Sequence, residues 1–272
     1  MSIAHLEMPV ELHYAYSVAA FAVGALVGLT GVGGGALMTP ILLALGVQPA
    51  TAVGTDLLYA AITKSCAIPV HQRRRTVQWP VVGRLALGSV PGAVLALWWL
   101  RDLAAHTPLL ERRLLAVLGA ALLLTAAAML LHEPLRRRRA RNGGSTASIV
   151  PERWLAPATV AAGAVLGVLV TLSSVGAGAL GAMALYLLYP RLPTAAIVGT
   201  DIAHAVPLAL VAGLGHLQLG NVDGTLLASL LLGSVPGIVL GTRLGLRLPE
   251  HVVRPLLASF LLFIGAGLVL RA

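Results

Sequence analysis

The sequence is poor in charged and aromatic residues. Only 11% of its 272 residues are charged and 4% are aromatic, whereas 58% are hydrophobic and the mean hydropathy is +0.89. Soluble domains carry about 25% charged residues, so this composition excludes an ordinary soluble domain. Several apolar runs are long enough to cross a bilayer as helices, and the ten-residue alternation of membrane barrels is absent. The sequence therefore predicts an all-α polytopic membrane protein.

Other scarce features exclude further classes. Cys66 is the single cysteine, which excludes an intrachain disulfide. The net charge of +9 comes mostly from arginines in short loops between apolar runs, where basic residues set membrane orientation, and the few aromatics argue against a nucleic-acid surface. The sequence has neither a Walker motif nor a metal-ligand spacing such as H-E-x-x-H. The first 16 residues lack Lys and Arg, so we expect no cleavable signal peptide.

The chain contains an internal repeat. GSVPG and VGTD each occur twice, at the same spacing, and GVGGGA aligns with SVGAGA when a gap of two residues is allowed. Three matches in the same order predict two copies of one unit. The predicted parts are an N-terminal repeat (1–131), a basic linker (132–153) and a C-terminal repeat (154–272). The motif pairs lie at Gly88–Gly92 and Gly233–Gly237, Val53–Asp56 and Val198–Asp201, and Gly31–Ala36 and Ser174–Ala179.

Each unit predicts a glycine-broken helix pair followed by three transmembrane helices. The piece after the first break, Ala36–Leu45, is too short to span a bilayer, so we expect the broken helices to meet inside the membrane. The broken stretches are Tyr14–Leu45 and Leu155–Tyr189. The predicted helices are Ala50–Val70, Pro80–Leu100 and Arg112–Leu131 in the first unit, and Thr194–Leu214, Gly224–Leu244 and Val252–Leu270 in the second.

The arginine distribution predicts the topology. If each broken stretch enters and leaves on one side, each unit crosses three times and the two units are inverted. Fourteen arginines then lie on one side and four on the other, against eleven and seven if each stretch crosses once. The positive-inside rule favours the inverted repeats, with the linker in the cytoplasm and both termini outside. The predicted location is the cytoplasmic (inner) membrane.

The glycine breaks are candidate substrate sites. Unpaired backbone groups inside a bilayer are tolerated only against protein or a water-filled cavity, and inverted repeats place the substrate between broken helices at the midplane. Helix N-termini at a break suit an anion. Close helix packing is the alternative, and we favour it for scattered glycines such as Gly24 and Gly163. The candidate substrate residues at the breaks are Gly31, Gly33, Gly34, Gly35, Ser173, Ser174, Gly176 and Gly178.

Ionisable residues within apolar helices are candidate coupling groups, because they are costly in a bilayer. Asp56 and Asp201 occupy equivalent positions after Gly-Thr, and His204 lies on the same helical face as Asp201. Lys64 lies two turns past Asp56. The alternatives are helix capping by the aspartates and snorkelling of Lys64 to the interface. Two threonines beside the aspartates, Thr55 and Thr200, offer hydroxyl groups. We expect His71 and His216, at helix ends, to be simple interfacial residues.

These motifs resemble the sulfite exporter TauE/SafE family of membrane transporters. The resemblance covers nearly the whole chain and is carried by GLTGVGGGALMTPILLALG at Gly28–Gly46, ATAVGTDLL at Ala50–Leu58 and HQRRRTVQW at His71–Trp79. The second half is looser, with SSVGAGALG at Ser173–Gly181 and AAIVGTD at Ala195–Asp201. The resemblance implies a secondary transporter of small sulfur-containing or organic anions, such as sulfite or sulfonates. Both copies depart from the family in having Asp after Gly-Thr, where a small uncharged polar residue is usual.

The leading prediction is transport of a small anion coupled to protons or a cation, without a cofactor. The breaks, Thr55 and Thr200 would bind the anion, and Asp56, Asp201, Lys64 and His204 would couple transport to the second ion. In a second hypothesis, Asp56 and Asp201 coordinate a metal or other cation as the substrate. A third is a membrane-embedded enzyme or a non-transporting subunit. An enzyme should show a second polar cluster near one interface, and the sequence shows none, so we expect no enzyme.

Overall fold

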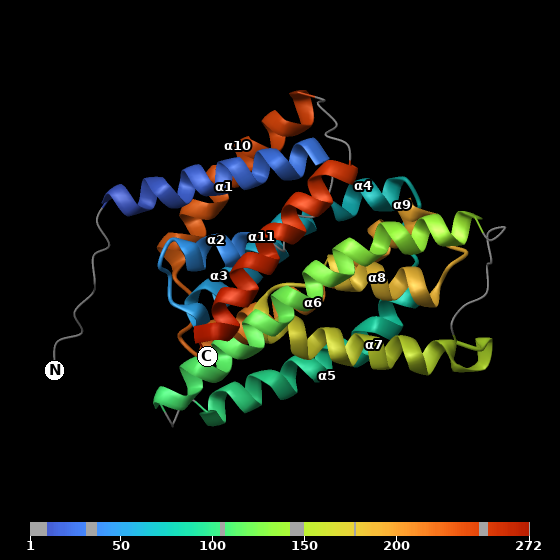
Figure 1. Ribbon diagram of the computed structural model, residues 1–272, viewed down its shortest axis with the longest axis horizontal. Coiled ribbons are helices and arrows are strands. Elements are labelled where there is room, and N and C mark those ends of the chain that lie inside the picture. The colour runs from blue at the N-terminus through green and yellow to red at the C-terminus, as the bar shows by residue number, and fades with distance from the viewer. Residues whose placement is uncertain are drawn as a thin grey trace.

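The computed structural model describes residues 10–30, 37–103, 107–141, 150–176, 178–244 and 250–271. Every regular element in these ranges is a helix (Figure 1), which confirms the all-α prediction. The helices are α1 (Val10–Thr30), α2 (Met38–Ala44), α3 (Pro49–Ser65), α4 (Ile68–Arg73), α5 (Trp79–Leu103), α6 (Thr107–Arg141), α7 (Glu152–Ser173), α8 (Ala179–Leu188), α9 (Thr194–Gln218), α10 (Gly224–Leu244) and α11 (Glu250–Arg271).

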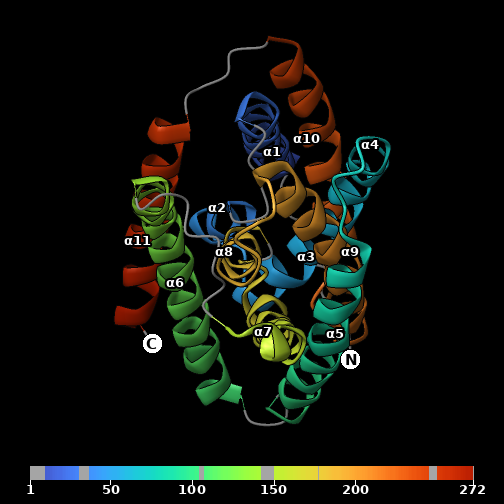
Figure 2. The same cartoon turned by 90° about the vertical axis from the view of Figure 1, so that its right-hand side faces the viewer.

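The helices of the two halves are interleaved. In the motif alignment, α1, α2, α3, α5 and α6 correspond to α7, α8, α9, α10 and α11. The closest pairs are α1 with α10, α5 with α7, α3 with α9, and α6 with α11. This packing pattern is symmetric: when each helix is replaced by its counterpart in the other repeat, the same four pairs result. Figures 1 and 2 show the two short helices α2 and α8, which follow the breaks, in the middle of the bundle.

Counterpart helices that touch each other run in opposite directions. Near the start of α3, Gly54 lies against Asn221, which follows the end of α9. Near the start of α9, Gly199 lies against Thr76, which follows α4. Likewise, Gly119 in the first half of α6 lies against Val269 near the end of α11, as the opposed chain directions in Figure 1 also show. The pairs α1–α10 and α5–α7 run parallel instead.

The repeated GSVPG motif provides the surface for these parallel pairs. A side chain at Gly88 would collide with the Val160 carbonyl of α7, and one at Gly233 would collide with the Ser17 carbonyl of α1. Small residues allow helix backbones to approach this closely in membranes. The packing interpretation of the scattered glycines is confirmed as well, because Gly24 lies against the Ser234 carbonyl and Gly163 against the Leu85 carbonyl.

Three predicted C-terminal helix ends were wrong by four residues or more. One of them is the predicted end at Leu214, because α9 continues to Gln218. The helix predicted to end at Val70 ends at Ser65, and the chain turns before the separate helix α4, because Pro69 has no backbone N–H to donate to the Ser65 carbonyl. The helix predicted to end at Leu131 continues to Arg141. Arginine, leucine and alanine, which make up most of residues 135–141, are strong helix formers, so the first part of the predicted linker is helical. Helix α10 has the predicted bounds.

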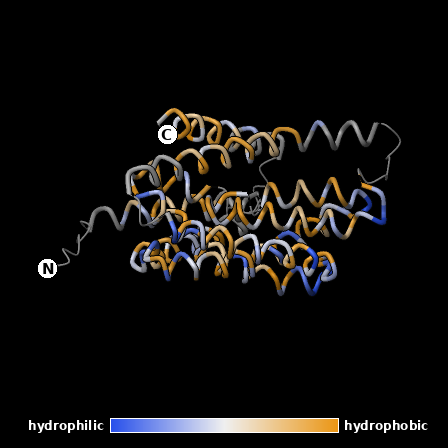
Figure 3. Tube along the Cα trace, turned by 90° about the horizontal axis from the view of Figure 1, so that it is seen from below, coloured by the Kyte–Doolittle hydropathy of each residue, from blue (hydrophilic) through white to orange (hydrophobic). Residues whose placement is uncertain are grey.

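Three of the described helical segments are long and apolar enough to cross a membrane: Trp79–Asp102, Glu152–Ser173 and Thr194–Gln218. Shorter apolar segments are found in most of the other helices. Figure 3 shows hydrophobic residues along much of the helices and hydrophilic stretches mainly towards their ends. Large hydrophobic side chains such as Leu87, Leu232 and Phe263 are exposed on the outer surface of the bundle, as expected for a surface in contact with lipid.

We predict that Gly88→Ala destabilises the protein by about 1–3 kcal/mol, because the added methyl group meets helix backbone that cannot move aside alone. Gly83→Ala on the same helix is the matched control, since the space around Gly83 is open. Melting temperatures in detergent, followed by tryptophan fluorescence, should fall for the first variant and stay level or rise for the second. Equal melting temperatures would contradict the packing role.

Candidate functional site

The second predicted helix break is present. Helix α7 ends at Ser173, Ser174 adopts a left-handed backbone with φ of 55°, and Gly176 has φ of 107°, a conformation that favours glycine. Helix α8 begins at Ala179. The chain reverses direction here, because the Thr159 hydroxyl near the start of α7 lies 2.8 Å from the Tyr189 hydroxyl just after α8. Helices α7 and α8 therefore form a hairpin with both outer ends at one end of the molecule.

The first break falls where the structure describes only the flanking helices. Helix α1 ends at Thr30 and α2 begins at Met38. The predicted substrate residues Gly31, Gly33, Gly34 and Gly35 lie outside the described residues, so their role remains a prediction.

Asp56 lies where the two halves meet. It is fully buried on α3, and its Oδ2 atom accepts hydrogen bonds from the Thr39 backbone N–H at 3.2 Å, the Thr39 hydroxyl at 2.5 Å and the Ser174 hydroxyl at 3.0 Å. Ser174 belongs to the break of the other repeat, so this carboxylate joins both halves. The capping alternative is partly right, because the Thr39 N–H belongs to the first turn of α2. Oδ1 has no hydrogen-bond partner among the described residues.

Asp201 has a different environment from its counterpart. It is 5% exposed on α9, and its Oδ1 atom also lacks a hydrogen-bond partner within the described ranges. That oxygen occupies the space where a side chain at Gly181 of α8 would lie. In the repeat alignment, Ala182 corresponds to Thr39, and Gly31 corresponds to Ser174. The two residues whose hydroxyls bond Asp56 therefore align with residues that have no hydroxyl in the other repeat.

Lys64 links the two aspartates. This half-buried side chain on α3 interacts electrostatically with Asp201 most strongly, and also with Asp56. His204 interacts with the same ammonium group, and its Nε2 atom lies 2.8 Å from the Ser89 hydroxyl. The structure thus brings the four predicted coupling residues into one buried cluster, the central cluster: Asp56, Asp201, Lys64 and His204.

The predicted substrate hydroxyls have partners within the protein. The Thr55 hydroxyl accepts the Asp223 N–H at 3.1 Å, and the Thr200 hydroxyl accepts the Gln78 N–H at 3.0 Å. Asp223 and Gln78 immediately precede α10 and α5, so both bonds fix the same helix junction in the two repeats. Ser173 donates to the Leu169 carbonyl at 2.6 Å within α7. Gly178 lies at the N-terminal end of α8. Substrate contact by these residues stays a prediction.

Sequence reasoning missed two polar partners of the central cluster and one hydrogen bond next to it. Thr39 bonds Asp56, Ser89 bonds His204, and Tyr59 bonds Ser234. Ser89 and Ser234 are the serines of the repeated GSVPG motif, so the duplication itself was a usable signal. The motif was interpreted only through its glycines and the repeat spacing. Thr39 precedes Pro40 and had no such signal.

The prediction that His216 is a simple interfacial residue was wrong. His216 is 2% exposed, and its Nε2 atom lies 2.9 Å from the Thr171 carbonyl of α7. Its counterpart His71 lies closer to the surface and contacts the Thr76 hydroxyl through Nδ1 at 2.9 Å. Both histidines fasten the turn that follows their helix, because Thr76 and Asn221 donate backbone N–H groups to their carbonyls.

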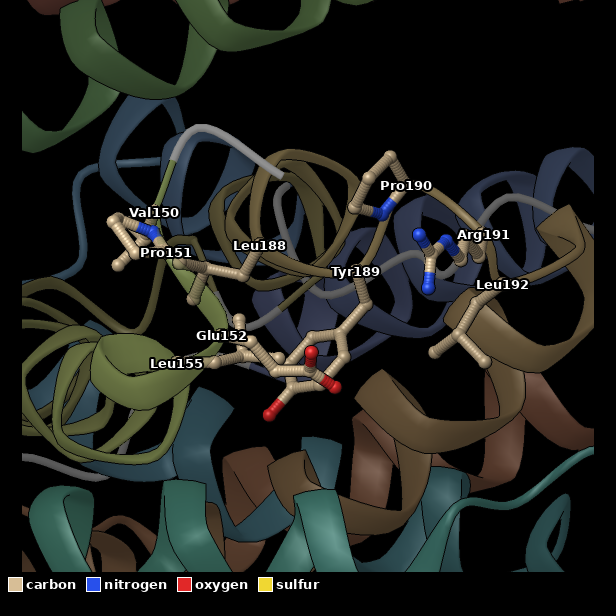
Figure 4. A pocket seen from close by; sticks show the side chains of 9 residues that line it. All are labelled: Val150, Pro151, Glu152, Leu155, Leu188, Tyr189, Pro190, Arg191 and Leu192. Atoms are coloured by element: carbon tan, nitrogen blue, oxygen red, sulfur yellow. The ribbon is translucent and has the colours of Figure 1, made fainter. Parts of the chain in front are cut away.

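A pocket of about 410 Å³ lies at the outer end of the α7–α8 hairpin (Figure 4). Tyr189 lies in it with Glu152 and Arg191 nearby, and its hydroxyl also lies 3.4 Å from the Arg84 guanidinium. The predicted substrate and coupling residues do not line this pocket. Among the described residues there is no group of three or more His, Cys, Asp or Glu side chains that could hold a metal ion.

We predict that Thr39→Val lowers the free energy of unfolding by about 1.5–3 kcal/mol, the range for hydrogen bonds to charged groups. Thr125→Val is the matched control, because Thr125 is equally buried but its hydroxyl bonds only the Ala121 carbonyl of its own helix. The control should lose about 1 kcal/mol or less. Denaturant unfolding in detergent measures both values, and equal losses would contradict a structural role of the bond to Asp56.

Comparison with known proteins agrees with this architecture. The sulfite exporter TauE/SafE family model matches residues 16–268. The "Probable membrane transporter protein YjnA" of Bacillus subtilis (strain 168) is 40% identical over 254 residues, which cover 91% of this chain and 96% of that protein. No solved structure matches the chain. The predicted resemblance is confirmed, and this chain belongs to the sulfite exporter TauE/SafE family of multi-pass membrane transporters.

Proposed function

We propose that the protein is a secondary transporter that moves a small anion, such as sulfite or a sulfonate, across the cytoplasmic membrane together with a proton or a cation. One observation carries the proposal. The Ser174 hydroxyl of one repeat's helix break binds the buried Asp56 carboxylate of the other repeat, beside Lys64 and Asp201. Buried ionisable groups at the junction of two repeats are typical of transport pathways.

The chemistry of this site favours an anion that travels with a second ion. Lys64 supplies a positive charge, and the N-terminal end of α8 at the break favours negative charge, so the two together suit a small oxyanion. The two carboxylates would repel the same anion. Binding of a proton or a cation removes that repulsion, so the anion and its counter-ion bind best together.

The directions of the helices support inverted repeats. If each unit crossed the membrane four times, the units would be parallel, and counterpart helices such as α3 and α9 would run in the same direction. They pack antiparallel, as inverted units require. In this arrangement the α7–α8 hairpin enters and leaves from the cytoplasm, and the pocket beside Tyr189 opens on that side.

Transport of a cation is the second candidate. The observation in its favour is that Asp56 Oδ1 and Asp201 Oδ1 are buried without a hydrogen-bond partner in the described parts of the chain. A cation bound to these oxygens would satisfy both. Saturable uptake of a divalent cation, lost in either Asp→Asn variant, would favour this candidate over the anion.

We predict that reconstituted protein transports sulfite or a small sulfonate, and that an imposed pH gradient stimulates the flux. Asp201→Asn should reduce gradient-driven uptake to the level of protein-free liposomes. Asp102→Asn is the matched control, because this carboxyl group is exposed at the end of α5 and should leave transport unchanged. Absence of flux for both anions in sealed vesicles would contradict the proposed substrate class.

We predict that Arg191 and Asp102 face opposite sides of the membrane. Cysteines introduced singly at these exposed positions, in a Cys66→Ser background, should react with an impermeant maleimide in opposite vesicle orientations. Arg191→Cys should be labelled from the cytoplasmic side and Asp102→Cys from the outside. Parallel units would place both positions on one side, so labelling from the same side would contradict the inverted arrangement.

A further inference from the structure

The duplicated aspartates have unequal surroundings, and we propose that they have unequal roles. Asp201 carries the transported proton, Asp56 remains an ionised structural anchor, and proton binding at Asp201 releases Lys64 to hold the substrate anion. This inference rests on the proposed function of coupled anion transport and names the residue that performs each part.

Asp56 is surrounded by donors that suit an ionised carboxylate. Three hydrogen bonds, from the Thr39 N–H, the Thr39 hydroxyl and the Ser174 hydroxyl, converge on Oδ2. The 2.5 Å bond from the Thr39 hydroxyl has the length of a charge-assisted O–H···O⁻ bond. Protonation of Asp56 would weaken this network, which also fastens α2 to α3 and the second break to the first repeat. Asp56 is therefore suited to hold the site together through the cycle.

Within the described residues, Asp201 lacks the equivalent hydroxyl donors. The positions that would supply them are occupied by Ala182 and Gly31, neither of which has a hydroxyl. Its Oδ1 atom lies against Gly181, where a larger residue would collide with it. The opposite charge that acts on Asp201 is Lys64. A buried carboxylate that interacts with one ammonium group can exchange that interaction for a proton.

The other groups around Asp201 do not replace Lys64 in this role. His204 lies one turn further along α9 and is held by Ser89 of α5, while Lys64 reaches it as well. Helix α4 brings His71 against Gly199, near the start of α9. On the side of α8, Gly181 lies against Asp201, and on the side of α3 the charged residues are Asp56 and Lys64. Lys64 therefore connects Asp201 to the rest of the central cluster.

The net charge of the central cluster explains how binding of the proton would be coupled to binding of the anion. Two ionised aspartates and one ammonium group leave one net negative charge on Asp56, Asp201 and Lys64 together. In this state Lys64 is occupied by carboxylates and an anion is repelled. When a proton from water bonds to an Asp201 oxygen, the net charge of the cluster becomes zero, and Lys64 can exchange its interaction with Asp201 for one with the anion. Proton and anion then leave together, and the proton returns to water on the other side.

This coupling predicts electroneutral transport of a monovalent anion. One proton and one monovalent anion carry no net charge, so the empty and the loaded cluster have the same charge. Membrane potential should not change the rate of such a cycle.

The test uses proteoliposomes and measures two quantities separately: anion counterflow, and anion uptake driven by a pH gradient. Asparagine at position 201 mimics the protonated aspartate, so Asp201→Asn should keep anion counterflow, make it independent of pH, and lose gradient-driven uptake. Asp56→Asn should be less stable, and the transport by its folded fraction should still depend on pH. Lys64→Gln should lose anion counterflow, because the ammonium group is the anion's partner. Retained pH dependence in Asp201→Asn, or its loss in Asp56→Asn alone, would overturn the proposal.

A second measurement does not depend on transport. Infrared difference spectra of reconstituted protein report the carbonyl band of protonated carboxyl groups as the pH is changed. Exposed carboxyl groups lose their protons at about pH 4, so a carbonyl band that persists above this pH comes from a buried carboxyl group. This band should be absent in Asp201→Asn and present in Asp56→Asn and Asp102→Asn. The reverse result for the first two variants would overturn the assignment. If wild-type protein transports no anion yet shows the Asp201 band, the substrate class fails while the assignment of the proton holds.

Discussion

The burial of two carboxylates inside an apolar helix bundle is the constraint on which the other features of this site depend. A buried charge must be paired or hydrogen-bonded, because the loss of water costs more than a bundle of this size can tolerate. Asp56 obtains its donors only because α1 and α7 each stop inside the bundle and let α2 and the Ser174 turn approach. The helix breaks, the interleaving of the repeats and the half-buried Lys64 are therefore parts of one arrangement.

Duplication explains why the same contacts appear twice, and the differences between the copies are the basis for the unequal roles that we propose. The hydrogen bonds of Thr55 and Thr200 and the close approaches of Gly54 and Gly199 are equivalent. These contacts hold the scaffold. The partners of Asp56 and Asp201 are not equivalent, and His204 stands where the first repeat has Tyr59. The asymmetry is concentrated in the central cluster, which is the proposed site of proton and anion binding.

The sequence was sufficient for the fold class, the second break and most helix positions, because composition, motif spacing and glycine clusters are local properties. It also identified Asp56, Asp201, Lys64 and His204, since ionisable residues are rare in apolar runs. The contact of Ser174 with Asp56 was beyond reach, because it depends on how two distant segments pack. Thr39 was missed for the same reason. The helix end at Arg141 was missed because a basic run was interpreted as a loop, although its residues favour helix.

The central claim is that proton and anion bind to one cluster and assist each other. The most direct measurement is proton uptake on anion binding by purified protein in weakly buffered solution, recorded with a pH indicator during titration with sulfite or a sulfonate. The account predicts that about one proton is taken up for each monovalent anion bound, and that the uptake disappears in Asp201→Asn while binding remains. Anion binding without proton uptake, or with proton release, would contradict it.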